Sequence, residues 1–203
     1  MDFRRPLGVV TPTLDGDVLA VLAGAEEEFS GRRIHVLLGT GSENGVRKAA
    51  ERLADQGVIL SRRAGRANLY RLNRAHVAAP YIEGLSTLRA QLFDRLRSTI
   101  SAWSLPPRLA MVFGSVARGE ATPRSDLDLL VIRPSNVNEE VAEWRDQLAV
   151  LEGRATEWTG NEARILEYGE GELGDAAVRG VIKEAFADGI ELYGSRRSFR
   201  SSA

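Results

Sequence analysis

The sequence predicts an α+β protein built from two parts of different character. Within residues 1–80, helical apolar patterns come first and two short strand-like runs follow them. Between Arg108 and Arg133, two apolar runs flank a Gly-Ser turn and a polar loop, which predicts strand, turn, short helix, loop and strand. A change of composition at Ala78-Ala79-Pro80 places the boundary there, so the expected domains are 1–80 and 81–203.

Two carboxylates, Asp126 and Asp128, begin the second strand of the central stretch. Side chains alternate along a strand, so both carboxylates face one side while Leu127 and Leu129 face a core on the other. Neighbouring like charges disfavour joint ionisation, so the pair needs a compensating cation. Two carboxylates completed by phosphate oxygens and water are typical of Mg²⁺, or Mn²⁺ in its place. We therefore predict that Asp126 and Asp128 bind a metal and are catalytic.

The Gly-Ser turn before the polar loop has the features of a phosphate-binding turn. Glycine lets the backbone approach a phosphate group closely, and a hydroxyl beside the N–H groups of a helix N-terminus suits an anion. An arginine in the following turn adds positive charge. The predicted nucleotide-binding residues are Gly114, Ser115, Arg118 and Ser125.

The order of these pieces resembles a known signature. Gly114-Ser115-x-Ala117-Arg118-Gly119, a loop, and Ser125-Asp126-x-Asp128-Leu129 resemble the motif of the polymerase-beta-like nucleotidyltransferases, particularly the minimal nucleotidyltransferases of prokaryotes. The resemblance implies an α/β domain with a mixed sheet. It also implies a nucleoside triphosphate substrate and transfer of the nucleoside monophosphate to a hydroxyl on RNA, protein or a small molecule. Members of the minimal family often act as toxin or antitoxin components.

One part of that resemblance is incomplete. The family usually places a third carboxylate on a strand that reads Glu162 to Glu167 here, and the expected position falls at or near Arg164. An arginine is neither a metal ligand nor a general base. Glu167 is expected on the opposite face of this strand from position 164, and Glu162 lies at the start of the strand. Either could act as the third carboxylate only if the strand register differs from the one expected. Glu167 is the candidate third catalytic acid, and the alternative is a domain that binds nucleotide without efficient turnover.

The third helix of the first domain is the most clearly marked element there. Thr40-Gly41-Ser42-Glu43 matches a capping box, and an apolar stripe follows. After it, strands at 58–62 and 67–72 are joined by a basic turn, Arg63-Ala64-Gly65-Arg66. From Glu43 to Arg74 there are eight Lys and Arg residues against three Asp and Glu. The residues of the stripe are Val46, Ala49, Ala50 and Leu53.

Three helices and a basic hairpin resemble a winged helix-turn-helix, which implies duplex DNA as a partner. In that resemblance the third helix enters the major groove and the hairpin contacts phosphates or the minor groove. The base-reading candidates are Asn44, Arg47 and Lys48, and the backbone-contacting candidates are Arg62, Arg63 and Arg66. The alternative is a protein-binding module whose charges are a solvated helix face.

The remaining segments complete the expected arrangement. The first ten residues are expected to be a loose arm, and Asp15 or Asp17 is expected to cap the first helix. A continuous helix over 82–104 carries an apolar stripe that serves as core or as a homodimer seam. A helix capped by Asn138, with Val141 on its inner face, is expected over 139–152. Further along we expect a strand over 163–168, a helix over 175–187 and a disordered tail over 195–203.

Composition bounds the function classes. The chain has no cysteine, which excludes disulfides, thiolate metal sites and a cysteine nucleophile. No signal-like start or membrane segment is evident, so a cytoplasmic location is expected. Two functions from different classes remain. One is a metal-dependent nucleotidyltransferase that carries a DNA-binding domain. The other is a DNA-binding transcriptional regulator whose nucleotidyltransferase-like domain is a nucleotide sensor or dimerisation unit.

Overall fold

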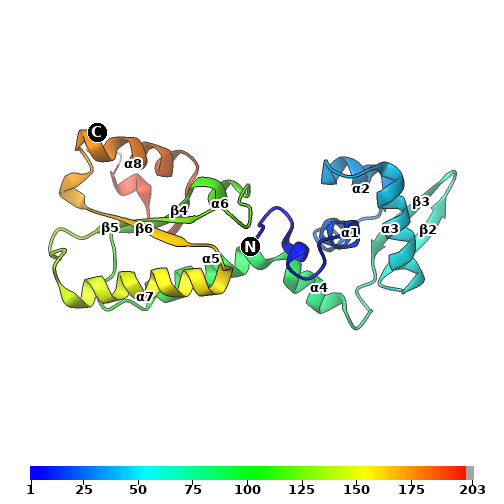
Figure 1. Ribbon diagram of the computed structural model, residues 1–203, viewed down its shortest axis with the longest axis horizontal. Helices are drawn as coiled ribbons and strands as arrows, with labels where there is room; N and C mark the ends of the chain where they lie inside the picture. Colours follow the sequence, from blue (N-terminus) through cyan, green and yellow to red (C-terminus); the bar gives the residue numbers. More distant parts are fainter. Residues whose placement is uncertain (200–203) are drawn as a thin grey trace. The chain divides into compact units, whose positions relative to one another are not determined.

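The computed structural model describes residues 1–199, and the chain divides into two compact units (Figure 1). The N-terminal unit comprises Asp2 and Arg4–Leu88, and the C-terminal unit comprises Met1, Phe3 and the chain from Arg89 onward. The division therefore falls later than the boundary expected at Pro80. The physical reason is that the helix beginning at Ala79 packs its Ile82 into the N-terminal core.

The N-terminal unit consists of helices around a small antiparallel sheet of order β1-β3-β2. A 3₁₀ helix, η1, precedes the first α-helix. The elements are η1 (Pro6–Val9), α1 (Leu14–Ala23), β1 (Phe29–Ser30), α2 (Gly31–Leu38), α3 (Glu43–Asp55), β2 (Ile59–Ala64), β3 (Ala67–Leu72) and α4 (Ala79–Ser86).

Local capping sets the ends of α2 and α3, but the residue that caps α3 is Ser42 and not Thr40, the first residue of the expected capping box. The Ser30 hydroxyl accepts a hydrogen bond from the Arg33 N–H at the start of α2, and Gly39 ends that helix at φ 64°. At the start of α3 the Ser42 hydroxyl accepts from the Gly45 N–H at 3.0 Å. All four residues of the predicted α3 stripe are buried. The hairpin strands run on to Ala64, so its turn is shorter than the four residues expected.

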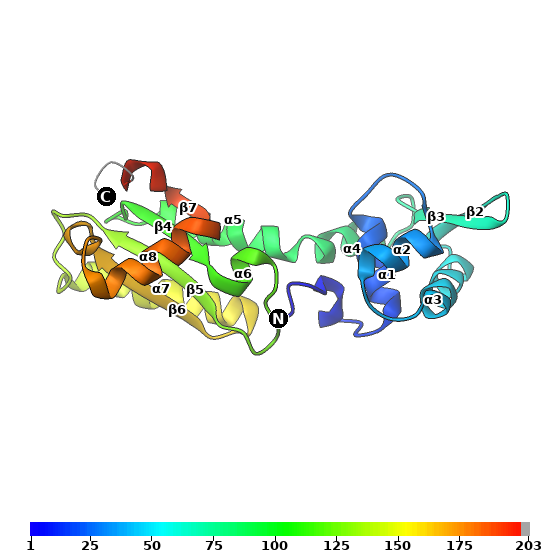
Figure 2. The same ribbon diagram turned by 90° about the horizontal axis from the view of Figure 1, so that it is seen from above.

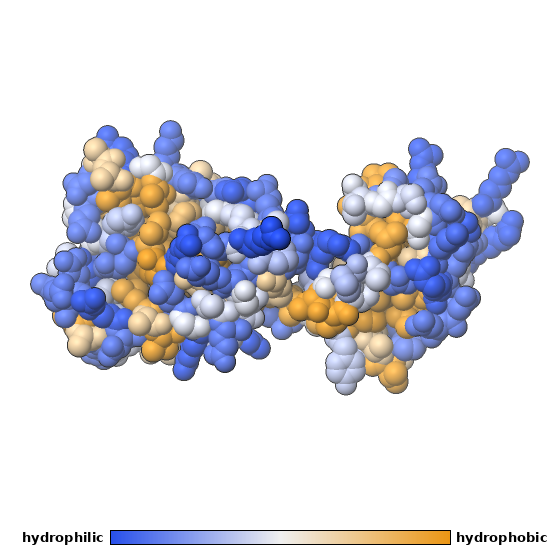
Figure 3. All heavy atoms as spheres, in the orientation of Figure 1, coloured by the Kyte–Doolittle hydropathy of each residue, from blue (hydrophilic) through white to orange (hydrophobic). Residues whose placement is uncertain are grey.

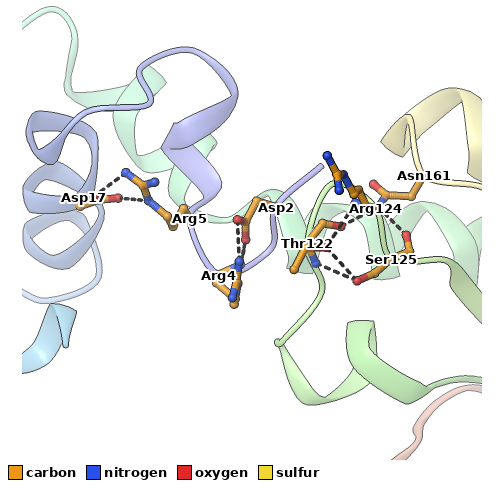
Figure 4. Close-up of polar contacts among 8 residues, drawn as sticks. All are labelled: Asp2, Arg4, Arg5, Asp17, Thr122, Arg124, Ser125 and Asn161. Carbon is orange, nitrogen blue, oxygen red and sulfur yellow. Dashed lines mark hydrogen bonds and ion pairs between the residues drawn. The ribbon is translucent and has the colours of Figure 1, made fainter. Parts of the chain in front are cut away.

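The amino terminus differs from the expected loose arm. Pro6–Val9 form a 3₁₀ helix, and Leu7 is buried in the N-terminal core. Neither Asp15 nor Asp17 caps α1, because the N-cap residue is Thr13. The Asp15 carboxylate accepts hydrogen bonds from Arg52, and the Asp17 carboxylate is buried against Arg5 (Figure 4). The apolar packing of Leu7 and the ion pair of Arg5 therefore fasten this segment to the N-terminal unit.

The C-terminal unit contains a four-stranded mixed sheet of order β6-β5-β4-β7. The β5 and β6 strands are parallel and the other pairs are antiparallel, which confirms the mixed sheet expected from the sequence. The β7 strand was not expected. The elements are α5 (Leu88–Ser101), β4 (Leu109–Phe113), α6 (Gly114–Arg118), β5 (Leu127–Arg133), α7 (Ala142–Thr159), β6 (Ala163–Gly169), η2 (Glu170–Glu172), α8 (Ala176–Asp188), β7 (Ile190–Gly194) and η3 (Arg196–Phe199).

Helices cover both faces of this sheet. Helices α5 and α7 lie on one face and α8 lies on the other (Figures 1 and 2). Along β5, Leu127 and Leu129 join the core under α5 and α7, whereas Leu130 and Ile132 join the core under α8. The alternation places the Asp128 side chain on the α8 face, since it has the parity of Leu130.

The helix expected over 82–104 is two helices, α4 and α5, separated at Thr87. The Thr87 hydroxyl donates to backbone carbonyls of the preceding turn, a local bond that competes with helix continuation. The expected stripe serves both cores: Ile82 is buried in the N-terminal core, and Leu92 and Leu96 in the C-terminal one. It is core, and the dimer-seam alternative loses its support.

Two further expectations need correction. Helix α7 begins at Ala142 because the Asn138 side chain accepts from the Glu140 N–H in a turn, and Val141 remains exposed. In the tail expected to be disordered over 195–203, η3 forms and Phe199 packs against Phe186. Residues 200–203 lie outside the described residues.

Strand β6 lies at one edge of the sheet, and side chains bond to its outward N–H groups. The Ala163 N–H donates to the Thr156 hydroxyl and the Ile165 N–H to the Glu152 carboxylate, both on α7. The Gly169 N–H donates to the Glu172 carboxylate at 2.6 Å. Across residues 1–199, no helix is both long and apolar enough to cross a membrane.

Candidate functional site

The Gly-Ser turn and the carboxylate pair meet at one end of the sheet. Strands β4 and β5 are antiparallel with Phe113 opposite Asp128, so the turn that follows Phe113 lies beside this carboxylate. Gly114 has φ 68°, and a Cβ atom there would lie 2.9 Å from Asp128 Oδ2. Glycine is needed both for the left-handed backbone and for the close approach of the carboxylate.

The short helix α6 after the turn is held by an arginine that the sequence reasoning missed. Arg89 donates from Nε to the Val116 carbonyl at 3.1 Å and from Nη2 to the Ala117 carbonyl. Its guanidinium also lies over the Phe93 ring. These bonds satisfy carbonyls that a short helix leaves open and so fix the position of the turn. A contact between a side chain and distant carbonyls leaves no pattern in the sequence.

The loop that leads to Asp126 is fastened by Asn161, a second residue that the sequence reasoning missed. Asn161 is 2 % exposed, and its Nδ2 donates to the Thr122 and Ser125 carbonyls at 3.0 and 2.7 Å. The Ser125 hydroxyl accepts from the Thr122 N–H at 3.0 Å (Figure 4). Ser125, predicted to bind nucleotide, therefore closes the loop in this structure.

Arg164 stands at the position where the resemblance places a third carboxylate. It lies opposite Asp128 in the parallel register of β5 and β6, and its Nη1 lies 2.8 Å from Asp126 Oδ2. Its Nε also pairs with Glu162 at 3.4 Å. Burial raises the pKa of Asp128, the neighbouring Asp126 charge raises it further, and the Arg164 charge opposes both.

Glu167 is not brought to this site. It shares the parity of Ile165, which packs on the α7 face, while Asp128 lies on the α8 face. There Glu167 accepts a 2.6 Å hydrogen bond from Arg133 Nε. Glu167 therefore cannot serve as the third acid, because its position on β6 places its side chain on the opposite face of the sheet from Asp128.

The predicted phosphate-facing side chains are placed differently from one another. Ser115 is half-buried at the start of α6, and its hydroxyl makes no hydrogen bond within residues 1–199. Arg118 is exposed and already paired, from Nε to Glu120 at 2.9 Å and from Nη1 to Asp188 at 3.0 Å. Ser115 is thus open to a ligand, whereas Arg118 must leave acidic partners to reach one.

The donor set fits one divalent cation. No group of three or more His, Asp or Glu side chains among the described residues is arranged to hold a metal ion. Two carboxylates are nevertheless sufficient for Mg²⁺ when phosphate oxygens and water complete its coordination. Burial, and after it the neighbouring Asp126 charge, raise the pKa of Asp128, and a cation beside the two carboxylates would offset both effects.

In the N-terminal unit, a surface groove lies between α3 and the β2–β3 hairpin. Arg47 lies on its α3 side and donates to Asn44 at 2.7 Å and to Glu51 at 2.6 Å. The surface over α3 and the hairpin is largely hydrophilic (Figure 3). The polar and charged side chains that line the groove include the predicted Asn44, Arg47, Arg63 and Arg66, the acidic Glu43 and Glu51, and Arg32 of α2, which was not predicted.

Two of the predicted DNA contacts are placed apart from that groove. Arg62 is bound to Glu28, which neutralises it. Lys48 is exposed on α3, but neither it nor Arg62 is among the described lining residues. The basic character of the groove therefore rests on the other arginines.

Comparison with known proteins finds a family match within the C-terminal unit. Residues 94–190 match the family model of the nucleotidyltransferase domain. No curated protein matches the chain. A solved toxin-antitoxin structure with AMP-PNP shares 15% identity, covers 54% of this chain and 78% of its own, and has a TM-score of 0.39. Two mutants of the toxin-antitoxin MntA-HpeT share 13% and 16% identity, cover 54% and 53% of this chain and 78% and 76% of their own, and have TM-scores of 0.39 and 0.37.

Proposed function

We propose that the C-terminal unit binds a nucleoside triphosphate between the Gly114 turn and the Asp126 and Asp128 carboxylates, and transfers its nucleoside monophosphate to a hydroxyl acceptor. The observation that carries this proposal is the approach of Asp128 to Gly114, because it brings a glycine turn that suits a phosphate beside a carboxylate that suits a divalent cation. The family-model match over residues 94–190 supports it.

Each described residue has a distinct part in this proposal. Gly114 and Ser115 offer backbone approach and an open hydroxyl to the phosphates, and Asn161 keeps the Asp126 loop in place. Asp126 and Asp128 would hold Mg²⁺ or Mn²⁺, which supplies charge stabilisation at the phosphoryl oxygens when it is bound. Arg164 accepts no proton from the acceptor hydroxyl. We therefore expect turnover to be slow relative to nucleotide binding.

A matched pair of glycine variants tests the nucleotide site. In Gly114→Val the new side chain collides with Asp128, whereas in Gly153→Val it enters open space on α7. Wild type and Gly153→Val should melt at a higher temperature with Mg²⁺ and a nucleoside triphosphate, and Gly114→Val should show no shift. An unchanged wild-type melting temperature at saturating nucleotide and metal would overturn the proposal.

The hydroxyl acceptor of the proposed reaction has to be identified by a labelling assay. Radiolabelled nucleotide incubated with RNA, with a candidate toxin-antitoxin partner protein or with small hydroxyl compounds should label one of them. If binding is retained and no acceptor is labelled, the alternative of a nucleotide sensor gains support.

For the N-terminal unit we propose a winged helix-turn-helix that binds duplex DNA. The specific observation is the groove in which Arg47 of α3 meets Arg63 and Arg66 of the hairpin. Helix and hairpin are the elements that dock in such proteins. Together with the nucleotide site, this arrangement also suits the second candidate function, a transcriptional regulator that senses nucleotide.

Salt-dependent DNA binding tests this second proposal. Arg63→Ala should weaken binding to all duplex sequences and lower the salt slope by about one, since it removes a phosphate contact. Arg47→Ala should change sequence preference as well. Arg71→Ala, on the same hairpin but outside the groove-lining set, is the matched control. Failure of the wild type to bind any duplex at low salt would leave the protein-binding module as the better explanation.

A further inference from the structure

The C-terminal site holds an arginine on the carboxylate that would otherwise bind metal. Arg164 Nη1 contacts Asp126 at 2.8 Å and its Nε contacts Glu162 at 3.4 Å. Building on the proposed function, we propose that Arg164 exchanges Asp126 for a phosphate oxygen when nucleotide binds. Arg164 would then be a nucleotide-contacting residue that makes metal binding depend on nucleotide.

The position of Arg164 permits this exchange. Its side chain is 55 % exposed at the start of β6, so no packed core holds the guanidinium in place. A guanidinium has five N–H donors in a fixed fork, and the contacts to Asp126 and Glu162 use only two of its nitrogens. The remaining donors suit the geometry of a phosphate group.

Without nucleotide, the Arg164 contact works against metal binding. An incoming cation meets one carboxylate that is already paired, and a positive charge lies within 2.8 Å of that carboxylate. Like charges held in one site repel, so Asp126 becomes a poor ligand while Arg164 remains on it. Free Mg²⁺ or Mn²⁺ should therefore bind weakly to the apo protein.

With nucleotide, the balance is reversed. A triphosphate carries more negative charge than a single carboxylate and accepts bidentate hydrogen bonds from a guanidinium. Once Arg164 moves to the phosphates, Asp126 is released beside Asp128 for the cation that accompanies the nucleotide. Arg118 is less suited to this exchange, because it has three carboxylate partners, Glu120, Asp188 and, at 4.0 Å, Glu184, and its side chain is 38 % exposed against 55 % for Arg164.

Three variants separate the two effects of Arg164. Arg164→Gln removes the charge, Arg164→Lys keeps the charge without the fork, and Arg154→Gln removes an exposed arginine of α7 as the control. Mn²⁺ binding without nucleotide is followed by electron paramagnetic resonance. Binding of ATP with Mg²⁺ is followed by calorimetry.

Arg164→Gln should change the two affinities in opposite directions. Mn²⁺ should bind the apo variant about tenfold more tightly than wild type, and ATP with Mg²⁺ about tenfold more weakly, since one charge-assisted contact is exchanged in each case. Arg164→Lys should keep the weak Mn²⁺ binding and recover only part of the ATP affinity. Arg154→Gln should match wild type in both.

The outcomes distinguish this inference from the proposed function. If wild type binds ATP and Arg164→Gln binds it equally well, the inference fails while the proposed function stands. If Arg164→Gln gains no Mn²⁺ affinity, the arginine does not exclude metal and the inference fails again. If wild type binds no nucleotide of any kind, the proposed function fails and the inference falls with it.

Discussion

Arg5 binds Asp17 through two parallel hydrogen bonds, from Nε to Oδ1 and from Nη2 to Oδ2, each 2.8 Å long (Figure 4). The Asp17 side chain is only 5 % exposed. The pair therefore supplies the charge compensation that a buried carboxylate requires, and it fastens the amino-terminal segment to α1.

Arg5→Ala should lower the free energy of unfolding of the N-terminal unit by about 2 to 3 kcal/mol, since it leaves the Asp17 carboxylate buried without its partner. The neighbouring pair Arg4 and Asp2 provides the control, because its arginine is about half exposed and Arg4→Ala should therefore cost much less stability than Arg5→Ala. All three tryptophans, at positions 103, 144 and 158, belong to the C-terminal unit. The midpoint of urea unfolding followed by circular dichroism should therefore fall, whereas the midpoint followed by tryptophan fluorescence should not change. A fall in the fluorescence midpoint alone would contradict the prediction.

Asp128→Asn should stabilise the C-terminal unit at neutral pH in the absence of metal and nucleotide. The folded-state pKa of Asp128 is raised above its ordinary value of 3.8, so its contribution to stability is full below that pH and is lost as pH rises through the raised value. The asparagine variant avoids this loss, and its advantage over wild type should vanish in acid. Tryptophan-detected melting at a series of pH values measures the difference, with Asp146→Asn on α7 as an exposed control. Equal stability at neutral pH would show that the fold tolerates the charge without cost.

Asn161→Ala should loosen the loop that carries Asp126. The variant loses both donors to the Thr122 and Ser125 carbonyls, at a cost of about 1 to 3 kcal/mol. Arg124 is exposed in this loop, so trypsin should cut after it faster in the variant than in wild type. Asn138→Ala, which removes an exposed turn bond, should leave the cleavage rate unchanged. Unaltered cleavage after Arg124 would mean that the loop is held by other contacts.

Glu167→Gln should leave nucleotide affinity unchanged, because its side chain lies on the α7 face of the sheet, away from Asp128. The change weakens the hydrogen bond to Arg133, but Arg133 keeps the Val137 carbonyl as a partner. We therefore expect the free energy of unfolding to fall by about 1 kcal/mol. Calorimetry with ATP and Mg²⁺ checks the affinity and urea unfolding checks the stability. Loss of nucleotide binding without loss of stability would restore Glu167 to the site.

The sequence was informative where chemistry and local geometry coincide. Alternation along β5 predicted that Leu127 and Leu129 face a core while Asp128 faces away, and the two faces of the sheet confirm it. The buried stripe of α3 was predicted from its periodicity, although the helix is capped by Ser42 and not by Thr40, where the expected capping box begins. Arg164 was placed at the third-acid position, and the parallel register puts it opposite Asp128.

Errors arose where tertiary contacts decide the structure. Arg5 lies before the first helix and Asp17 lies within α1, and no sequence pattern links the two residues. The amino terminus was therefore expected to be loose. The apolar periodicity of 82–104 continues across Thr87 because both helices need a stripe, although each faces a different core. The β7 strand is short and directly follows α8, and residues 188–194, between the expected helix and the expected tail, were assigned to no element.

The side-chain bonds along the outer edge of β6 bear on the behaviour of the protein at high concentration. An edge strand with open N–H groups is a template on which a second chain adds a strand and fibres nucleate. Here Thr156, Glu152 and Glu172 already accept from three such groups. Growth of the sheet from this side would require helix α7 and the η2 turn to give up those bonds first, so crowded copies should not assemble through the β6 edge.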